Sequence, residues 1–153
     1  MHFQPDDDHL LLLEMLRAFA QDEVRPLAQE LDEQERFPVE TVRKMADCGL
    51  MGIPFPEAYG GQGGDNLAYI MAVEELSKVC GTTVVILSAH TSLCATPIFE
   101  HGTEEQKQRY LLPLAKGEKL GAFALTEPNA GTDAAGQQTT AVLQGDAYLL
   151  NGS

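Results

Sequence analysis

The residues best suited to chemistry lie in one stretch, 121–136, which reads GAFALTEPNAGTDAAG. It begins with small and larger apolar residues in alternation up to Thr126, a pattern that predicts a short buried strand. Pro128 ends that strand, and a loop of small residues centred on 131–133 follows. Small residues let a ligand approach the backbone, and peptide N–H groups beside threonine hydroxyls suit an acceptor-rich, anionic ligand. At this level an ordinary turn after a strand is the alternative.

Longer motifs decide between these two interpretations. The segment 124–133, ALTEPNAGTD, resembles the flavin-binding signature of the acyl-CoA dehydrogenase family. The stretch 88–95, SAHTSLCA, resembles the short-chain, butyryl-CoA-type bacterial members of that family. The residues 59–63, YGGQG, and the closing 150–153, LNGS, also fit the pattern. The resemblance therefore covers essentially the whole chain, with its motifs in the expected order.

The resemblance implies FAD as the cofactor, held by the backbone and hydroxyl groups of the first strand. Carried over by position, the Phe123 carbonyl accepts from the flavin imide, and the Leu125 N–H donates to a ring carbonyl. The Thr126 hydroxyl faces the ring nitrogen on that side. Gly131 and Thr132 match the part that binds the pyrophosphate and lies against the thioester substrate. Phe123 stands where relatives often carry Tyr, which matters little if only its carbonyl is used.

The resemblance also implies an acyl pocket lined by an apolar helix, and the candidate substrate-binding residues on it are Ile86, His90, Leu93 and Cys94. The depth of such a pocket sets the acyl length, since each buried methylene is worth roughly 0.8 kcal/mol. We expect His90 to be pocket wall or core. Metal binding is not expected, because no carboxylate pair with ligand spacing joins His90 and His101.

No catalytic base is expected among these 153 residues. By residue type alone, Glu127 and Asp133 could form an acid/base pair. The resemblance implies instead that both are structural, and that the proton-abstracting base is a glutamate in a later helical domain. A later threonine that contacts the flavin is absent in the same way. We therefore expect this chain to hold half of a site and to be inactive alone.

Composition limits the classes of partner. The chain carries 10 Lys plus Arg against 23 Asp plus Glu, a formal net charge of −13. This balance argues against nucleic acid and against an anionic membrane surface, because both attract cationic proteins. It leaves phosphate-bearing cofactors possible, since backbone N–H groups and helix N-termini bind phosphate without net positive charge.

Two further features favour a cytoplasmic protein. The first eight residues are acidic, whereas a secretory signal or a mitochondrial transit peptide would be basic there. The apolar run 10–13 is far too short to span a bilayer. The three cysteines, Cys48, Cys80 and Cys94, form no C-x-x-C pair, and we expect reduced, mostly buried thiols.

Apolar periodicity predicts a helical first part. The expected helices cover residues 6–31, 38–48, 65–79, 82–100 and 103–113. The first should be one long helix bent near Pro26. Asp65 should cap the third helix, Gly81 should end it, and Ile70 should lie on its buried side. Thr103 and Gln106 should form a capping box at the start of the last helix. The helix 82–100 is apolar on nearly all sides, so we expect it to be buried on most faces and central.

The glycine-rich segment 60–64 has two interpretations. A phosphate-binding P-loop would need a Lys-Ser or Lys-Thr pair directly after it, and neither is present. A structural turn is the better interpretation.

Strand alternation replaces helical spacing near residue 120. Runs at 121–126, 139–143 and 147–150 predict strands, with a hairpin turn at 144–146. The predicted fold is mainly α, with an up-and-down-type helical domain over 1–119. The first strands of an antiparallel β domain follow over 120–153, so that the complete protein is α+β. Because these strands would leave an uncovered face and a raw edge, we expect the N-terminal part of a longer protein.

The resemblance implies a short-chain acyl-CoA dehydrogenase that converts an acyl-CoA to a trans-2-enoyl-CoA and passes electrons to an electron-transfer flavoprotein. Relatives are usually homotetramers. Three alternatives remain at this stage: a non-catalytic helical interaction or assembly module, a dehydrogenase for branched acyl-CoA, and an acyl-CoA oxidase. The sequence does not fix the acyl length.

Overall fold

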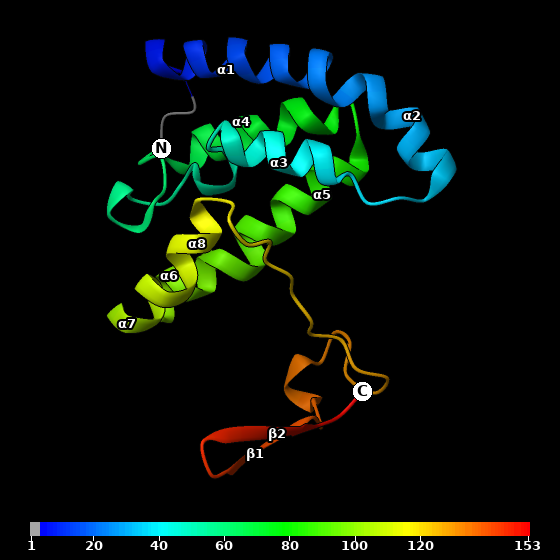
Figure 1. The fold of residues 1–153 in the computed structure, drawn as a ribbon, viewed down its shortest axis with the longest axis vertical. Helices are drawn as coiled ribbons and strands as arrows, with labels where there is room; N and C mark the ends of the chain where they lie inside the picture. Colours follow the sequence, from blue (N-terminus) through cyan, green and yellow to red (C-terminus); the bar gives the residue numbers. More distant parts are fainter. Residues whose placement is uncertain (1–3) are drawn as a thin grey trace. The chain divides into compact units, whose positions relative to one another are not determined.

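The computed structural model describes residues 4–153 of a chain that divides into two compact units, Met1–Ala122 and Phe123–Ser153. We call residues 4–122 the helical unit and residues 123–153 the C-terminal unit. The helical unit is built of helices packed against one another, and the C-terminal unit ends in an antiparallel hairpin (Figure 1). This confirms the predicted fold class.

One long helix opens the helical unit, as predicted. It comprises α1 (Asp7–Phe19), a π-helical turn (Ala20–Val24) and α2 (Arg25–Gln34). Asp6 is the N-cap, and its carboxylate accepts the His9 N–H at 2.9 Å. The helix bends between α1 and α2 (Figure 1), where Pro26 occupies the first turn of α2. A proline lacks the N–H of a helical hydrogen bond and crowds the carbonyl four residues earlier, which explains the distortion.

The same arrangement occurs twice more in the helical unit. In each case a π-helical stretch lies directly before a short α-helix whose first turn contains a proline. The pairs are 89–95 before α6 (Thr96–His101), with Pro97, and 107–111 before α8 (Leu112–Ala115), with Pro113. The wider turn relieves the clash that each proline ring would cause in a regular α-helix.

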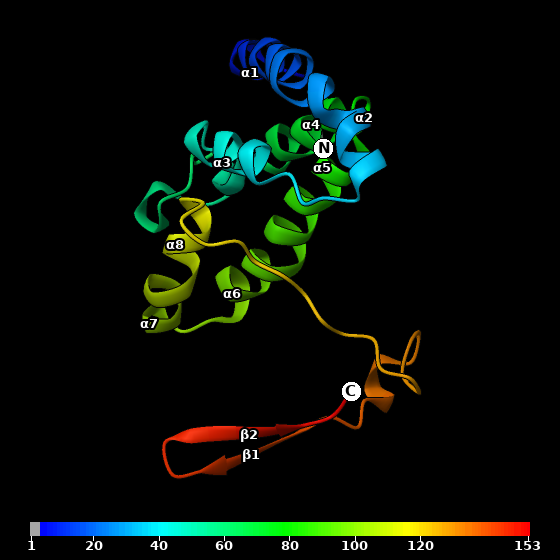
Figure 2. The same cartoon turned by 45° about the vertical axis from the view of Figure 1, so that its right-hand side comes forward.

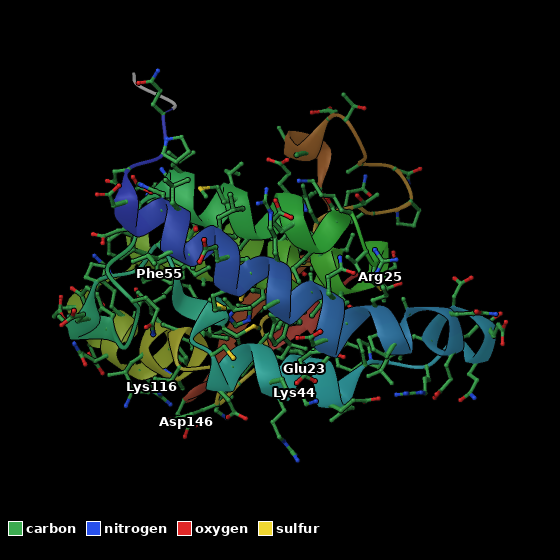
Figure 3. All side chains as sticks on the ribbon, turned by 90° about the horizontal axis from the view of Figure 1, so that it is seen from above. Glu23, Arg25, Lys44, Phe55, Lys116 and Asp146 are labelled. Atoms are coloured by element: carbon green, nitrogen blue, oxygen red, sulfur yellow. The ribbon has the colours of Figure 1, made fainter. Side chains whose placement is uncertain are left out.

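The second helix, α3 (Val39–Asp47), starts directly after Pro38, one residue later than predicted. Gly49 follows its end in a left-handed conformation, with φ +72°. Lys44 of α3 forms an ion pair with Glu23 on the first helix, and Figure 3 shows the two side chains together. The connection from Leu50 to Pro56 is packed, with a short 3-10 turn at Leu50–Gly52 and another just beyond it at Glu57–Tyr59.

The glycine-rich segment 60–64 is a structural turn, as predicted. The Gly61 N–H donates to the Pro56 carbonyl at 3.2 Å. A β-carbon on Gly61 would collide with the carbonyl of Phe55, so this turn requires a residue without a side chain.

The third helix, α4 (Asn66–Ser77), begins at the predicted Asp65 cap, whose carboxylate accepts the Ala68 N–H at 2.8 Å. Two details of the prediction were wrong. Gly81, expected to end this helix, is the first residue of the next helix, α5 (Gly81–Ser88), and α4 already ends at Ser77. Ile70, expected inside, is 53% exposed because the buried side of α4 carries Ala68, Met71, Ala72, Glu75 and Leu76.

The continuous helix formed by α5, residues 89–95 and α6 was expected to be buried on most faces, and this was wrong. Thr83, Leu87 and His90 are buried, whereas Val85 is 64% exposed. Among the described residues, none covers Val85 fully. The prediction failed because apolar composition does not show how many neighbouring elements a chain supplies. By length and composition alone this helix could cross a membrane, a test that core helices of soluble proteins also pass.

The helical unit has two apolar cores. The larger joins the first helix with α3, α4 and α5 around Leu16, Met45 and Leu76. The smaller consists of Phe55, Ala95, Leu111, Leu114 and Ala115, with Phe99 edge-on to Phe55 at a ring distance of 5.8 Å. Figure 2 shows α6, α7 (Glu104–Gln106) and α8 together at one end of the unit. Thr103 and Gln106 form the predicted capping box of α7.

The C-terminal unit contains one hairpin. Strand β1 (Thr140–Gln144) pairs with β2 (Ala147–Asn151), and Gly145 opens the turn with φ +65°. This confirms the hairpin prediction to within a residue at each end. The strand expected over 121–126 is wrong, because these residues form no regular structure and are mostly exposed. A strand must exchange hydrogen bonds with a neighbour, and no described residues supply one here.

Candidate functional site

Two of the predicted cofactor residues line a hollow within the C-terminal unit. Leu125 and Thr126 line it together with Glu127, Gln137 and Thr139, and its volume is about 440 Å³. Ala124, Leu150 and Ser153 complete the lining. The Leu125 side chain is 40% exposed, and Phe123, just before this segment, is 48% exposed. These positions are accessible to a ligand.

Several polar groups of this segment are free to bind a ligand. Among residues 4–153, no intrachain hydrogen bond uses the Leu125 N–H, the Thr126 hydroxyl or the Phe123 carbonyl. Gly131 and Thr132 are exposed, and a β-carbon built on Gly131 would have no atom within 4 Å. The backbone is therefore open at the positions predicted to meet a ring edge and a diphosphate.

The Glu127 carboxylate is held by the backbone and is not free to act as an acid or base. The Glu127 carboxylate accepts two backbone N–H groups, from Gln138 at 2.7 Å and from Thr139 at 3.0 Å. Hydrogen bonds from Thr139 and Gln138 lower the pKa of Glu127 below its usual value, because they favour the charged form. The structure gives Glu127 a structural role, as the sequence resemblance implied.

His90 lies in the core of the helical unit and is fully buried. Its Nδ1 accepts the Gly121 N–H at 2.9 Å, so the neutral ring carries its proton on Nε2. Burial lowers the pKa of His90, opposed by the nearby carbonyls of Leu114 and Met51. A neutral, buried imidazole with one nitrogen bonded to the backbone fixes the segment that leaves the helical unit.

The four predicted pocket residues do not share one environment. His90 and Cys94 lie together against Gly121, where a β-carbon would come within 2.7 Å of the Cys94 sulfur. Ile86 is half-buried, and Leu93 is 46% exposed. The predicted site residues thus form two groups, one in each unit.

Of the three cysteines, all free, Cys80 is buried, Cys94 is half-buried and Cys48 is exposed, so the expectation of mostly buried thiols was only partly right.

The free groups fit a flavin dinucleotide by their chemistry. A flavin edge presents carbonyl oxygens and an imide N–H, which need peptide donors and an acceptor. The N–H of Leu125, the Thr126 hydroxyl and the Phe123 carbonyl are of these kinds and have no partner in the described chain. The open backbone at Gly131 can approach a phosphate closely, which a bulky side chain would prevent.

Sequence reasoning missed Gln137. Its side-chain Nε2 donates to the Leu125 carbonyl at 2.5 Å and so fixes one peptide group of the cofactor segment. A glutamine among loop residues gives no local signal of such a role. The nearest clue is its position two residues before a predicted strand.

Comparisons with known proteins bear on this site. The sequence profile of the acyl-CoA dehydrogenase N-terminal domain matches residues 6–118. The chain is 67% identical over its whole length to the short-chain specific acyl-CoA dehydrogenase of Clostridium acetobutylicum, of which it covers 40%.

Two solved structures are similar to the chain. One, from work on the electron transferring flavoprotein of Acidaminococcus fermentans, has 53% identity and a TM-score of 0.94 over 99% of this chain and 40% of that one. The other is butyryl-CoA dehydrogenase from Megasphaera elsdenii, with 46% identity and a TM-score of 0.92. It is matched by 99% of this chain, over 41% of its own length. The chain therefore spans about 40% of the length of these relatives.

Proposed function

This chain belongs to the acyl-CoA dehydrogenase family, and we propose that its protein oxidises short-chain acyl-CoA to trans-2-enoyl-CoA with FAD. The observation that carries the proposal is the set of unpaired backbone and hydroxyl groups from Phe123 to Thr126, beside a hollow of about 440 Å³. These groups are the ones that the flavin signature of the sequence predicted.

The residues of this chain would bind and orient the cofactor. The Phe123 carbonyl would accept from the flavin imide, the Leu125 N–H would donate to a ring carbonyl, and the Thr126 hydroxyl would face the adjacent ring nitrogen. When bound, FAD supplies the two-electron acceptor for the reaction. Donors fixed at this edge favour the form of the ring that carries negative charge, and because they are in place beforehand they need not reorganise.

The loop that follows would hold the diphosphate. Gly131 presents open backbone, and Thr132 adds an exposed, uncharged hydroxyl. Peptide N–H groups bind phosphate without adding positive charge, which suits a chain with a net charge of −13. Thr132 would also lie against the thioester substrate.

The helix that carries Ile86, Leu93 and Cys94 would limit the length of the acyl chain that can bind. His90 would support this wall from the core, since it is fully buried and bonded to Gly121. A side chain that shortens the pocket by one methylene should weaken the binding of a longer substrate by roughly 0.8 kcal/mol or more, because one methylene of that substrate is no longer buried. The 67% identity to a short-chain specific acyl-CoA dehydrogenase supports a short-chain substrate of the butyryl-CoA type.

The proton-abstracting base is proposed to come from residues outside this chain. Among the residues described, Glu127 is occupied by two backbone N–H groups and cannot take a substrate proton while it holds them. We further propose an electron-transfer flavoprotein as the electron acceptor, a homotetramer as the assembly and the cytoplasm as the location. Family membership supports the first two, and the acidic composition supports the last.

The test uses the protein expressed from its complete gene. It should purify yellow, and addition of butyryl-CoA without oxygen should bleach the visible flavin absorbance. Longer and branched acyl-CoA substrates should bleach it more slowly. Reoxidation by an electron-transfer flavoprotein should be faster than by oxygen, and the reverse would indicate an oxidase. A colourless protein that stays colourless when offered FAD would contradict the proposal.

A further inference from the structure

Two polar side chains of the C-terminal unit use their hydrogen bonds on the backbone that surrounds the proposed flavin segment. The Glu127 carboxylate accepts the N–H of Gln138 at 2.7 Å and that of Thr139 at 3.0 Å. The Gln137 side chain donates to the Leu125 carbonyl at 2.5 Å. Three bonds therefore join residues 125–127 to residues 137–139.

These bonds close the loop that contains Gly131 and Thr132. Near the start of the loop, Glu127 and Ala130 exchange both backbone hydrogen bonds, at 3.0 and 3.1 Å. The loop is thus fixed at its base by side chains and near its start by a tight turn. The peptide groups of Gly131 and Thr132 take no part in any of these bonds and stay exposed.

Apolar packing cannot hold this loop in place. Among the described residues of the C-terminal unit, Ala130 is the single buried hydrophobic residue. The segment before Glu127 also lacks a neighbouring strand in the described chain. Where burial and strand pairing are both missing, side chain to backbone hydrogen bonds must set the shape, as they do in many functional loops.

The pairing also reduces an electrostatic problem. A carboxylate beside a diphosphate site would repel the ligand if its oxygens faced it. Both Glu127 oxygens are instead turned to backbone donors. The carboxylate can therefore lie in the loop that serves an anionic ligand, provided that the two N–H groups stay in place.

We propose that Glu127 and Gln137 are positioning residues for FAD, which brace the loop 125–139 so that its remaining free donors face the cofactor. Gln137 occupies the Leu125 carbonyl, and Glu127 occupies the N–H groups of Gln138 and Thr139. The Leu125 N–H, the Thr126 hydroxyl and the peptide groups of Gly131 and Thr132 are left for the ligand. This inference rests on the proposed function.

The test compares Glu127→Gln and Gln137→Met with Asp146→Asn in the protein expressed from its complete gene. Asp146 lies in the exposed hairpin turn (Figure 3), so its variant removes a carboxylate of the same unit without touching the brace. Two quantities are measured: amide exchange over residues 123–139 in FAD-free protein, and the FAD dissociation constant. Neither depends on turnover.

Glu127→Gln should speed exchange at Gln138 and Thr139 and raise the FAD dissociation constant by about tenfold or more, since it removes charge-assisted hydrogen bonds. Gln137→Met should raise the constant by a smaller factor, and Asp146→Asn should change neither quantity. Gln137 is exposed, so its variant tests the brace even if Glu127→Gln fails to fold.

If both Glu127→Gln and Gln137→Met keep the amide exchange rates and the FAD affinity of the wild type, the positioning role is overturned and the proposed function stands. A wild-type protein that does not take up FAD would overturn the proposed function itself, and the positioning role with it. Faster exchange without weaker FAD binding would also overturn the positioning role, because the brace would then be structural only.

Discussion

Each of the two units of this chain is stabilised internally by a different kind of interaction. In the helical unit, Leu16, Met45 and Leu76 are fully buried in a shared apolar core. In the C-terminal unit, the side chains of both strands are exposed, and hydrogen bonds from Glu127 and Gln137 set the loop before them. A helix satisfies its backbone internally, whereas extended backbone needs a neighbour, so the second unit uses side chains where neighbouring strands are missing.

The largest expected difference concerns apolar side chains. Leu76→Ala should lower the free energy of unfolding by about 2–5 kcal/mol, because it leaves a cavity in a closed core. Leu150→Ala, at a side chain 68% exposed, should change it by less than about 0.5 kcal/mol. Urea unfolding of the 153-residue chain followed by circular dichroism would measure both. Equal losses would show that the C-terminal unit has a core of its own.

Two glycines sharpen the same comparison. Gly121→Ala should destabilise the helical unit by about 1–3 kcal/mol, because the new β-carbon would lie 2.7 Å from the Cys94 sulfur and 3.4 Å from His90 Nδ1. Gly131→Ala has open space and should leave stability nearly unchanged. In the complete protein it should instead weaken FAD binding, since the methyl group would occupy the approach of the diphosphate. Thermal unfolding and FAD titration of both variants separate the two effects.

Sequence patterns predicted the helical unit far better than the C-terminal segment. The Asp65 cap, the Thr103 capping box and the bend at Pro26 follow from local rules, and all three are present. Exposure of Val85 and Ile70 could not be read from the sequence, because it depends on which neighbours pack nearby. The hairpin at Gly145 was predictable from its turn residues.

The candidate site was only partly accessible to such reasoning. The residues Phe123 to Thr126 were found through a family motif, although their predicted strand does not form in this chain. Alternation indicates that a segment suits a sheet, but a sheet also requires a partner strand. The role of Gln137 depends on a contact with Leu125 across a loop, and no local pattern encodes that contact.

A smaller effect concerns side chain to backbone hydrogen bonds in each unit. The Thr103 hydroxyl accepts the Gln106 N–H at 3.3 Å, and Thr103→Ala should cost about 1 kcal/mol of unfolding free energy. Gln137→Met removes a shorter bond, yet it should leave global unfolding unchanged and speed only local amide exchange. Hydrogen exchange with residue resolution distinguishes these results. A global loss in Gln137→Met would mean that the loop unfolds together with the helices.

The smallest effect is a difference between the two units in their response to alkaline pH. In the helical unit His9 lies between two helix caps, with Nε2 at 3.1 Å from Asp65 and Nδ1 at 2.6 Å from Asp6. Hydrogen bonds to Asp65 and then Asp6 raise the pKa of His9 above 6.5. Its contribution is therefore complete below pH 6.5 and is lost as the pH rises through the raised value.

Glu127 in the C-terminal unit behaves in the reverse sense. Its pKa is lowered from 4.5, so its contribution is present above pH 4.5 and is lost only as the pH falls through the lowered value. Asp6 and Asp65 also have lowered pKa values, so acid should loosen both units. The alkaline side discriminates: above pH 6.5, exchange at the start of α1 and α4 should speed up while that of Gln138 and Thr139 does not, after correction for intrinsic rates. His9→Gln should abolish this alkaline change, and a wild-type response that persists in the variant would assign it to another group.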